Sequence, residues 1–187
     1  MFGLKRSHVA PAAAAAHEPE DSGSGMAEAL QRATFAAGCF WGVEAAFREI
    51  KGVVRTTVGY TGGQTSNPSY HDVCGHGTGH AEAVEVWFDP SRLGYDDLLR
   101  TFWAIHNPTT RNRQGLDIGS QYRSAIFVHD ADQAAQASAS LAEHQKQIRK
   151  AIVTEIVPAE TFWKAEDYHQ RYFEKQGRAA CAVSLQP

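Results

Sequence analysis

The pentapeptide GCFWG places Cys39 between two glycines and two bulky aromatic residues, directly after a short apolar run. We expect Cys39 at a strand-to-helix junction, where unpaired backbone N–H groups favour a thiolate and lower the thiol pKa. Gly38 and Gly42 permit a tight turn and the close approach of another molecule. Phe40 and Trp41 are then expected to be exposed as a small apolar pocket beside the sulfur. The pattern indicates a reactive thiol, with a buried structural cysteine as the alternative.

A second group of chemically capable side chains lies in the polar, glycine-rich stretch HDVCGHGTGH. Cys74, His76 and His80 are possible metal ligands in this stretch. Structural zinc sites usually combine two such ligand pairs, and only this one cluster occurs here. We therefore expect a polar loop and no bound metal, with the metal site as the alternative.

The elements that must position these residues predict one α+β domain. Apolar alternation and helical spacing indicate strands and helices in the order β-α-β-β-α-β-α-β-α, with strands at 33–38, 53–58, 81–89, 122–128 and 151–157, and helices at 43–50, 95–107, 130–150 and 161–175. The first six elements match a ferredoxin-like split βαβ unit, which predicts a two-layer sandwich with helices on one face of a mixed sheet.

The strand expected at 81–89 alternates apolar and acidic residues, which predicts one solvent-facing side. Glu82 and Glu85 are three positions apart, so they fall on opposite faces of this strand. Alternation alone does not distinguish a Glu82 that faces solvent from one that faces a site.

Composition limits the class of protein. The chain has 187 residues, a net charge of −3 and three cysteines. Without a basic excess it is not expected to bind nucleic acid, and basic residues are scattered apart from Arg111 and Arg113 in a polar loop. Few cysteines and the absence of a long apolar run predict a cytoplasmic protein that has no membrane span and stands alone as a monomer. We expect a flexible arm at 1–30, a catalytic domain at 31–175 and a mobile tail at 176–187.

The chain resembles the A-type peptide methionine sulfoxide reductases over about 140 residues, a span far longer than a single motif match. GCFWG is similar to the catalytic signature of that family. Six further segments follow the family pattern in the same order along the chain: GYTGG (59–63), NPSY (67–70), TGHAEAVEV (78–86), FWAIHNPT (102–109), DIGSQYRSAIF (117–127) and AEDYHQRYF (165–173).

The resemblance implies reduction of methionine-S-sulfoxide in peptides, proteins and free methionine, without a cofactor. It implies that Cys39 attacks the sulfoxide sulfur and that Glu82 is the acid that protonates the leaving oxygen. Tyr70 and Tyr122 match the tyrosines whose hydroxyls bond that oxygen. Asp117 matches a loop carboxylate that fixes the tyrosine or water network.

The resemblance also assigns the apolar pocket and the recycling step. Phe40 and Trp41 would hold the S-methyl group of the substrate. Cys181 matches the resolving cysteine, which would form a disulfide with the sulfenic acid of Cys39 before reduction by thioredoxin. The chain departs from many members in lacking a further tail cysteine and in reading QGRAAC where an Asn-Pro and a tyrosine are common.

Two other functions remain open from the residues alone. A cysteine hydrolase would pair Cys39 with a histidine base such as His80 or His169. A peptide-binding module would use Phe40 and Trp41 as a recognition slot, with the thiol incidental.

Overall fold

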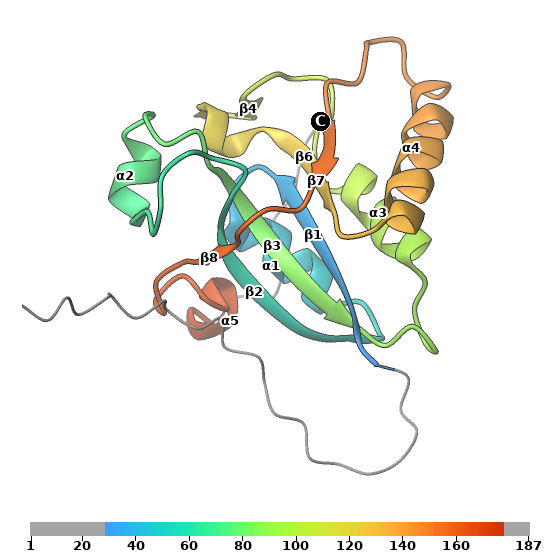
Figure 1. Ribbon diagram of the computed structural model, residues 1–187, viewed down its shortest axis with the longest axis horizontal. Helices are drawn as coiled ribbons and strands as arrows, with labels where there is room; N and C mark the ends of the chain where they lie inside the picture. Colours follow the sequence, from blue (N-terminus) through green and yellow to red (C-terminus); the bar gives the residue numbers. More distant parts are fainter. Residues whose placement is uncertain (1–28, 178–187) are drawn as a thin grey trace, which may run out of the picture.

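The computed structural model describes residues 29–177 and has helices packed on a mixed six-stranded sheet (Figure 1). The strand order is β7-β6-β1-β3-β2-β8, and all neighbouring strands are antiparallel except β6 and β7. The strands of the sheet are β1 (Gln31–Ala37), β2 (Val53–Thr61), β3 (Ala81–Phe88), β6 (Ser124–Val128), β7 (Glu155–Pro158) and β8 (Trp163–Lys164). The helices are α1 (Phe40–Arg48), α2 (Tyr70–Cys74), α3 (Tyr95–Ala104), α4 (Ala131–Gln145) and α5 (Tyr172–Lys175).

The four strands β6-β1-β3-β2 have the order of a ferredoxin-like split βαβ unit, which confirms the predicted α+β class. A short hairpin, β4 (Arg113–Gln114) with β5 (Asp117–Ile118), and a 3₁₀ turn, η1 (Ser120–Tyr122), precede β6. Together they fill the segment between α3 and β6 that was expected to be a polar loop.

The main core lies between one face of the sheet and the helices α1 and α3. Alternate residues of β3, Val84 and Val86, are fully buried there against apolar residues of α1. Phe35 of β1 stacks on Phe47 of α1 with ring centroids 5.0 Å apart. This packing holds α1 against the sheet, so the first residues of α1 lie at a fixed place beside the strand ends.

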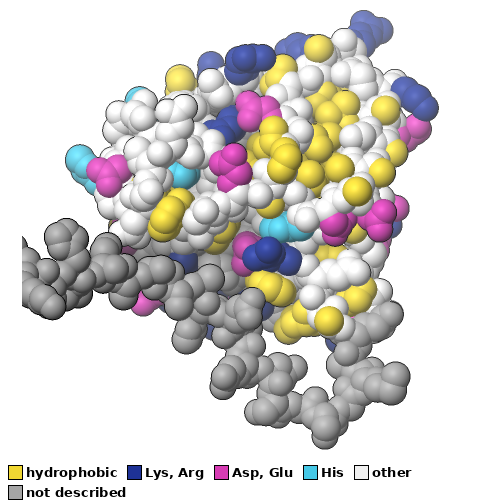
Figure 2. Space-filling model, in the orientation of Figure 1, with side chains coloured by type: hydrophobic (Ala, Val, Ile, Leu, Met, Phe, Trp, Pro, Cys, Tyr) yellow, Lys and Arg dark blue, Asp and Glu magenta, His cyan; other side chains and the backbone are white. Residues whose placement is uncertain are grey.

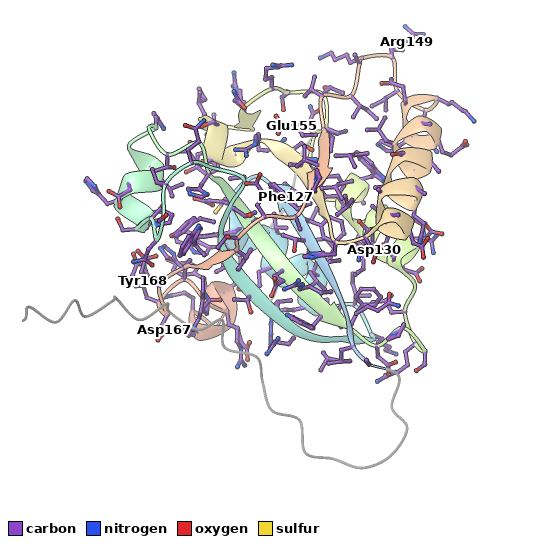
Figure 3. The ribbon with its side chains drawn as sticks, in the orientation of Figure 1. Phe127, Asp130, Arg149, Glu155, Asp167 and Tyr168 are labelled. Carbon is purple, nitrogen blue, oxygen red and sulfur yellow. The ribbon has the colours of Figure 1, made fainter. Side chains whose placement is uncertain are left out.

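The opposite face of the sheet is also covered, which corrects the prediction that β3 has a solvent-facing side. Ala81 and Ala83 are fully buried in a second, smaller apolar cluster that includes Phe127. The segment between β7 and β8 crosses this face, and Figure 3 shows Phe127 beneath it. Phe162 from the crossing segment packs against the cluster. Successive side chains of β3 therefore point into two different buried clusters, and neither side of the strand faces solvent.

Some element boundaries differ from those predicted. Helix α1 begins at Phe40 rather than at residue 43. Strand β7 covers only Glu155–Pro158 rather than the predicted 151–157, and α4 ends at Gln145 rather than at residue 150. The helix predicted for 161–175 is wrong for most of its length. Within this segment Trp163 and Lys164 instead pair with the edge of the sheet, where Trp163 lies opposite Tyr60, and only Tyr172–Lys175 is α-helical. Tertiary pairing with an open sheet edge has overridden a weak helical pattern.

The predicted arm at 1–30 and the predicted tail at 176–187, which contains Cys181, fall almost entirely outside the described residues. Among residues 29–177, no helix is both long enough and apolar enough to cross a bilayer.

Candidate active site

Cys39 is the residue immediately before the first turn of α1, as the glycine-flanked motif predicts. Its carbonyl accepts the first bond of the helix, from the N–H of Val43 at 3.4 Å. The preceding residue, Gly38, has a φ of +98°. A Cβ at that position would lie 2.8 Å from Cγ of Gln114 in the β4–β5 hairpin. Both the positive φ and the lack of space for a Cβ favour glycine at this position. The absence of a side chain lets the β4–β5 hairpin pack next to the residue that precedes Cys39.

The electrostatics of Cys39 correct the predicted direction of its pKa. Burial, with the charge of Glu82 as the next contribution, raises the pKa of the Cys39 thiol to about 12. The backbone N–H groups of Trp41 and Gly42 lower the pKa of Cys39, as expected at a helix N-terminus. Their effect is smaller than the cost of ionising a mostly buried thiol beside a carboxylate, so the resting group is a neutral thiol.

Glu82 is the principal acidic group at this end of α1. Its side chain is 1% exposed on the core-facing side of β3, where Val84 and Val86 also point. Oε2 accepts a hydrogen bond from the backbone N–H of Phe40 at 3.0 Å. Burial raises the pKa of Glu82 to about 7, with a further increase from Asp117. At neutral pH a large fraction of this carboxyl group therefore carries its proton.

Tyr70 and Tyr122 come from separate elements and face the same region. Tyr70 begins α2 and Tyr122 ends η1, and both are half-buried. Burial raises the pKa of both hydroxyls, to about 12 for Tyr122, and the charge of Glu82 contributes to each increase. The thiol of Cys74, four residues along α2, adds to the increase in the pKa of Tyr70. Both tyrosines are thus neutral hydrogen-bond donors close to the acid.

The two aromatic residues of the motif have different environments, which corrects the prediction that both are exposed. Phe40 is 1% exposed and packs against Tyr60, with ring centroids 5.9 Å apart. Trp41 is half-buried, and its ring stacks on Tyr172 with centroids 3.8 Å apart and planes 8° apart. Its Nε1–H donates to Nδ1 of His169 at 3.0 Å. Trp41 is therefore fixed on one face and one edge, while Phe40 belongs to the packed core.

This aromatic group is held in place by Glu166, to which sequence reasoning gave no role, and by His169, which it named only as a possible base of a cysteine hydrolase. His169 is 1% exposed, and its ring lies 4.4 Å from that of Tyr70 and 5.1 Å from that of Phe40, measured between centroids. Oε1 of Glu166 accepts from the N–H of Tyr70 at 2.8 Å, and its Oε2 accepts from the hydroxyl of Tyr60 at 2.9 Å. Their three-residue spacing within AEDYHQRYF was the only signal in the sequence that could have paired them.

Asp117 lies on β5, is exposed, and raises the pKa of both Cys39 and Glu82 through its charge. The structure thus gathers five predicted polar groups at one end of α1: Cys39, Tyr70, Glu82, Asp117 and Tyr122. Cys181 lies outside the described residues.

The contacts of His80 argue against two of the alternatives. Its Nδ1 accepts from the N–H of Gly63 at 3.1 Å, and its Nε2 lies 2.7 Å from the carbonyl oxygen of Thr65. Both ring nitrogens are therefore committed to the backbone and offer no lone pair to a metal or a thiol proton. Between residues 29 and 177 no group of three or more His, Cys, Asp or Glu side chains is arranged to hold a metal. His169 is likewise occupied at Nδ1 by Trp41.

Comparison with known proteins decides the family. The profile of the family described as peptide methionine sulfoxide reductase matches residues 31–187. The chain belongs to the peptide methionine sulfoxide reductase family. A peptide methionine sulfoxide reductase of Methanosarcina acetivorans is 56% identical over 166 residues, which cover 88% of each chain. The activity of this chain is accordingly that of an oxidoreductase that reduces methionine sulfoxide.

Solved structures agree with the fold. The reduced form of Mxr1 from Saccharomyces cerevisiae has a TM-score of 0.76 and 36% identity, over 80% of this chain and 87% of the other. Mxr1 in complex with Trx2 has a TM-score of 0.57 and 27% identity, over 77% and 85%. Methionine sulfoxide reductase A of Corynebacterium diphtheriae has a TM-score of 0.77 and 37% identity, over 80% and 76%. Within this reductase family, the geometry around Cys39 supplies the specific hypotheses that follow.

Proposed function

We propose that Cys39 is the nucleophile of this reductase and that Glu82 is its general acid. The observation that carries the proposal is the buried carboxyl group of Glu82, bonded to the N–H of Phe40 directly after Cys39, with a pKa raised to about 7. Oxygen is a poor leaving group from sulfur unless it is protonated as the sulfur is attacked. A carboxylic acid that remains neutral near pH 7 provides that proton.

The first step transfers one oxygen atom between two sulfur atoms. The Cys39 sulfur attacks the sulfoxide sulfur while Glu82 protonates the sulfoxide oxygen, and the thiol proton replaces the proton that Glu82 gives up. The S–S bond formed by this attack is broken again as the S–O bond of the substrate is replaced by an S–O bond to Cys39. The products are methionine and a sulfenic acid on Cys39, so the substrate sulfur gains two electrons and Cys39 loses two. A neutral resting thiol suits this step, because the carboxyl group and the thiol are both protonated before substrate arrives.

The tyrosines and aromatic residues serve orientation. Tyr70 and Tyr122 donate hydrogen bonds toward the oxygen as negative charge develops on it. Trp41 provides the apolar surface for the S-methyl group, with Phe40 as the packed layer beneath it. Asp117 keeps the pKa of Glu82 high from the hairpin side. We infer that the S epimer of the sulfoxide is the substrate, as the resemblance to the A-type reductases implies.

Recycling requires a second thiol and an external reductant. We propose that Cys181 condenses with the sulfenic acid, releasing water and forming a Cys39–Cys181 disulfide. A dithiol then reduces this disulfide by exchange. Mxr1 is known in complex with Trx2, and on that precedent thioredoxin is the reductant we assign to this chain. We place the enzyme in the cytoplasm as a monomer, with oxidised proteins, peptides and free methionine sulfoxide as substrates.

A thioredoxin-coupled assay of NADPH consumption, with separate S and R epimers of a methionine sulfoxide peptide, tests the proposal. We expect turnover of the S epimer only. The Cys181→Ser variant is expected to complete one round of oxygen transfer and then stop, since its sulfenic acid has no resolving thiol. Turnover of the R epimer alone would overturn the epimer assignment, and unimpaired steady-state turnover of Cys181→Ser would overturn the recycling route.

A further inference from the structure

Cys39 lines a large groove whose lining does not include the buried acid Glu82. It has a volume of about 1340 Å³ and is bounded by α1, α3, the β4–β5 hairpin and the loop that follows α4. A drug-sized ligand fills roughly 300–1,000 Å³, and a methionine sulfoxide side chain is smaller than such a ligand. The groove therefore has room for several residues on either side of the sulfoxide, which the proposed reaction at Cys39 does not itself use.

Apolar and basic side chains form different parts of the groove. Trp103, Leu116 and Ile148 contribute apolar surface, and Leu116 is 94% exposed at the tip of the hairpin. Arg149 and Lys150 lie at the far side, in the loop between α4 and β7 (Figure 3 shows Arg149 at the outer edge). Lys and Arg side chains follow this upper edge of the molecule in Figure 2. An exposed leucine beside lysine and arginine is typical of a surface that binds a chain with apolar and acidic residues.

Three basic side chains of the groove form no ion pair with any carboxylate in the described part of the chain. Among residues 29–177, no carboxylate lies within 4.0 Å of the charged nitrogens of Arg113, Arg149 or Lys150, whereas seven other cations of that span form ion pairs. Arg113 donates only to the backbone carbonyl of Gly115. Of the carboxylates in the described residues, Asp117 alone lines the groove, and its charge acts on Cys39. The three cations thus leave a positive field that an acidic ligand would neutralise.

We propose that this groove binds the segments of an oxidised protein that flank the methionine sulfoxide, and that it favours segments with acidic side chains. The inference deepens the proposed function and rests on Cys39 being the atom that the sulfoxide reaches. The apolar surface accepts the body of an extended peptide, while the cations select acidic side chains near the reacting residue. Oxidised methionines in acidic, unfolded segments would accordingly be repaired before those in basic segments.

The test measures oxygen transfer in a single turnover, with pre-reduced full-length enzyme and no thioredoxin. Three peptides carry methionine-S-sulfoxide flanked on both sides by Glu, by Ala or by Lys. We expect the second-order rate constant to be about 10-fold higher for the Glu peptide than for the Lys peptide, and the difference to shrink in about 0.5 M salt. The double variant Arg149→Glu/Lys150→Glu is expected to reverse the order of the peptides.

The matched control is Lys51→Glu/Arg92→Glu, which makes the same change in net charge at two exposed cations that do not line the groove. It is expected to keep the wild-type order of peptides. N-acetylmethionine-S-sulfoxide amide, which carries no flanking charge, is expected to react equally with all three proteins and reports the chemistry at Cys39 alone.

Each outcome decides the inference. Equal rates for the three peptides, with the small substrate still reduced, would overturn the groove proposal and leave the proposed function standing. No oxygen transfer to any substrate would overturn the proposed function instead. If charge reversal altered only the later reduction by thioredoxin, or only the formation of the Cys39–Cys181 disulfide, the groove would belong to the reductant or to the tail, and the substrate assignment would be wrong.

Discussion

Two glutamates are buried beside the same helix, yet only one of them is suited to chemistry. Glu44 lies in the middle of α1, and Glu82 lies on β3 next to the first turn of α1. Each side chain is 1% exposed. Glu44 accepts hydrogen bonds from the hydroxyl of Thr56 at 2.9 Å and from the N–H of Arg171 at 2.8 Å, so both its oxygens are used. Within residues 29–177, Glu82 accepts one hydrogen bond, from the N–H of Phe40.

The difference lies in what surrounds the charge. Burial raises the pKa of both carboxyl groups, but at Glu44 two hydrogen bonds and the guanidinium groups of Arg48 and Arg171 oppose that rise. At Glu82 only the Phe40 N–H opposes it, and Asp117 reinforces it. A buried carboxylate with several donors ties elements together, in this case α1, β2 and the segment before α5. A buried carboxyl group with one donor keeps its proton and can give it to a ligand.

The largest expected effect is on catalysis. Glu82→Gln should slow sulfoxide reduction by about 100-fold or more, because the amide cannot give up a proton to the leaving oxygen. Glu44→Gln, the matched change at the satisfied site, should leave the rate within about threefold, because it leaves the proton at Glu82 in place. Single-turnover rates measured with both variants check this contrast. Equal losses in the two variants would show that the comparison reflects folding rather than acid chemistry.

The second effect is on the pH dependence of stability. The folded-state pKa of Glu82, about 7, lies above its ordinary value of 4.5. Between these pH values the unfolded chain releases this proton and the folded protein retains it, so the free energy of unfolding falls as pH rises. The contribution is fully present below about pH 4.5, and about 3 kcal/mol of it is lost by pH values above 7. Urea unfolding of the wild type and Glu82→Gln across this range measures the difference in slope.

The variant should show a shallower fall in its free energy of unfolding, since glutamine does not titrate. Parallel pH profiles for the two proteins would contradict a raised pKa at Glu82, whatever the activity data show.

The smallest of these effects is on the stability contributed by Glu44. Glu44→Ala removes the acceptor for Thr56 and for the N–H of Arg171, leaving a buried hydroxyl and a backbone N–H without a partner. We expect the free energy of unfolding to fall by about 2 kcal/mol, with oxygen transfer by the folded fraction little changed. Chemical denaturation at a fixed pH near 7 measures the loss. An unchanged free energy of unfolding would mean that Glu44 does not join these elements.

Sequence reasoning succeeded where the pattern is strong and local. The order of the first six elements predicted the split βαβ arrangement. The glycines around Cys39 predicted a tight turn there, and Gly38 has the positive φ that such a turn uses. The prediction that Glu82 and Glu85 face opposite sides of β3 is confirmed, since Glu82 shares its side with Val84 and Val86, and Glu85 bonds the indole N–H of Trp87. A strand has a side-chain period of two, so this conclusion needs no knowledge of the fold.

Sequence reasoning failed where the structure of a segment depends on packing against residues that are distant in the sequence. The helix expected at 161–175 is mostly absent because Trp163 pairs with Tyr60 at the sheet edge. Phe40 is buried rather than exposed because His169, Tyr60 and Trp41 close around it. The assignment of a proton donor role to Glu82 came from family resemblance, and alternation gave no means of choosing it.

The amino-acid sequence by itself determined that a cysteine begins a helix, that β3 carries carboxyl groups on both sides, and that the chain has the motifs of its family. These features follow from periodicity and from residue types a few positions apart. Only the tertiary structure decided the ionisation states. The protons on Cys39 and Glu82 depend on how much solvent the packed helix and sheet exclude, and on the charge of Asp117, which the fold brings near both groups.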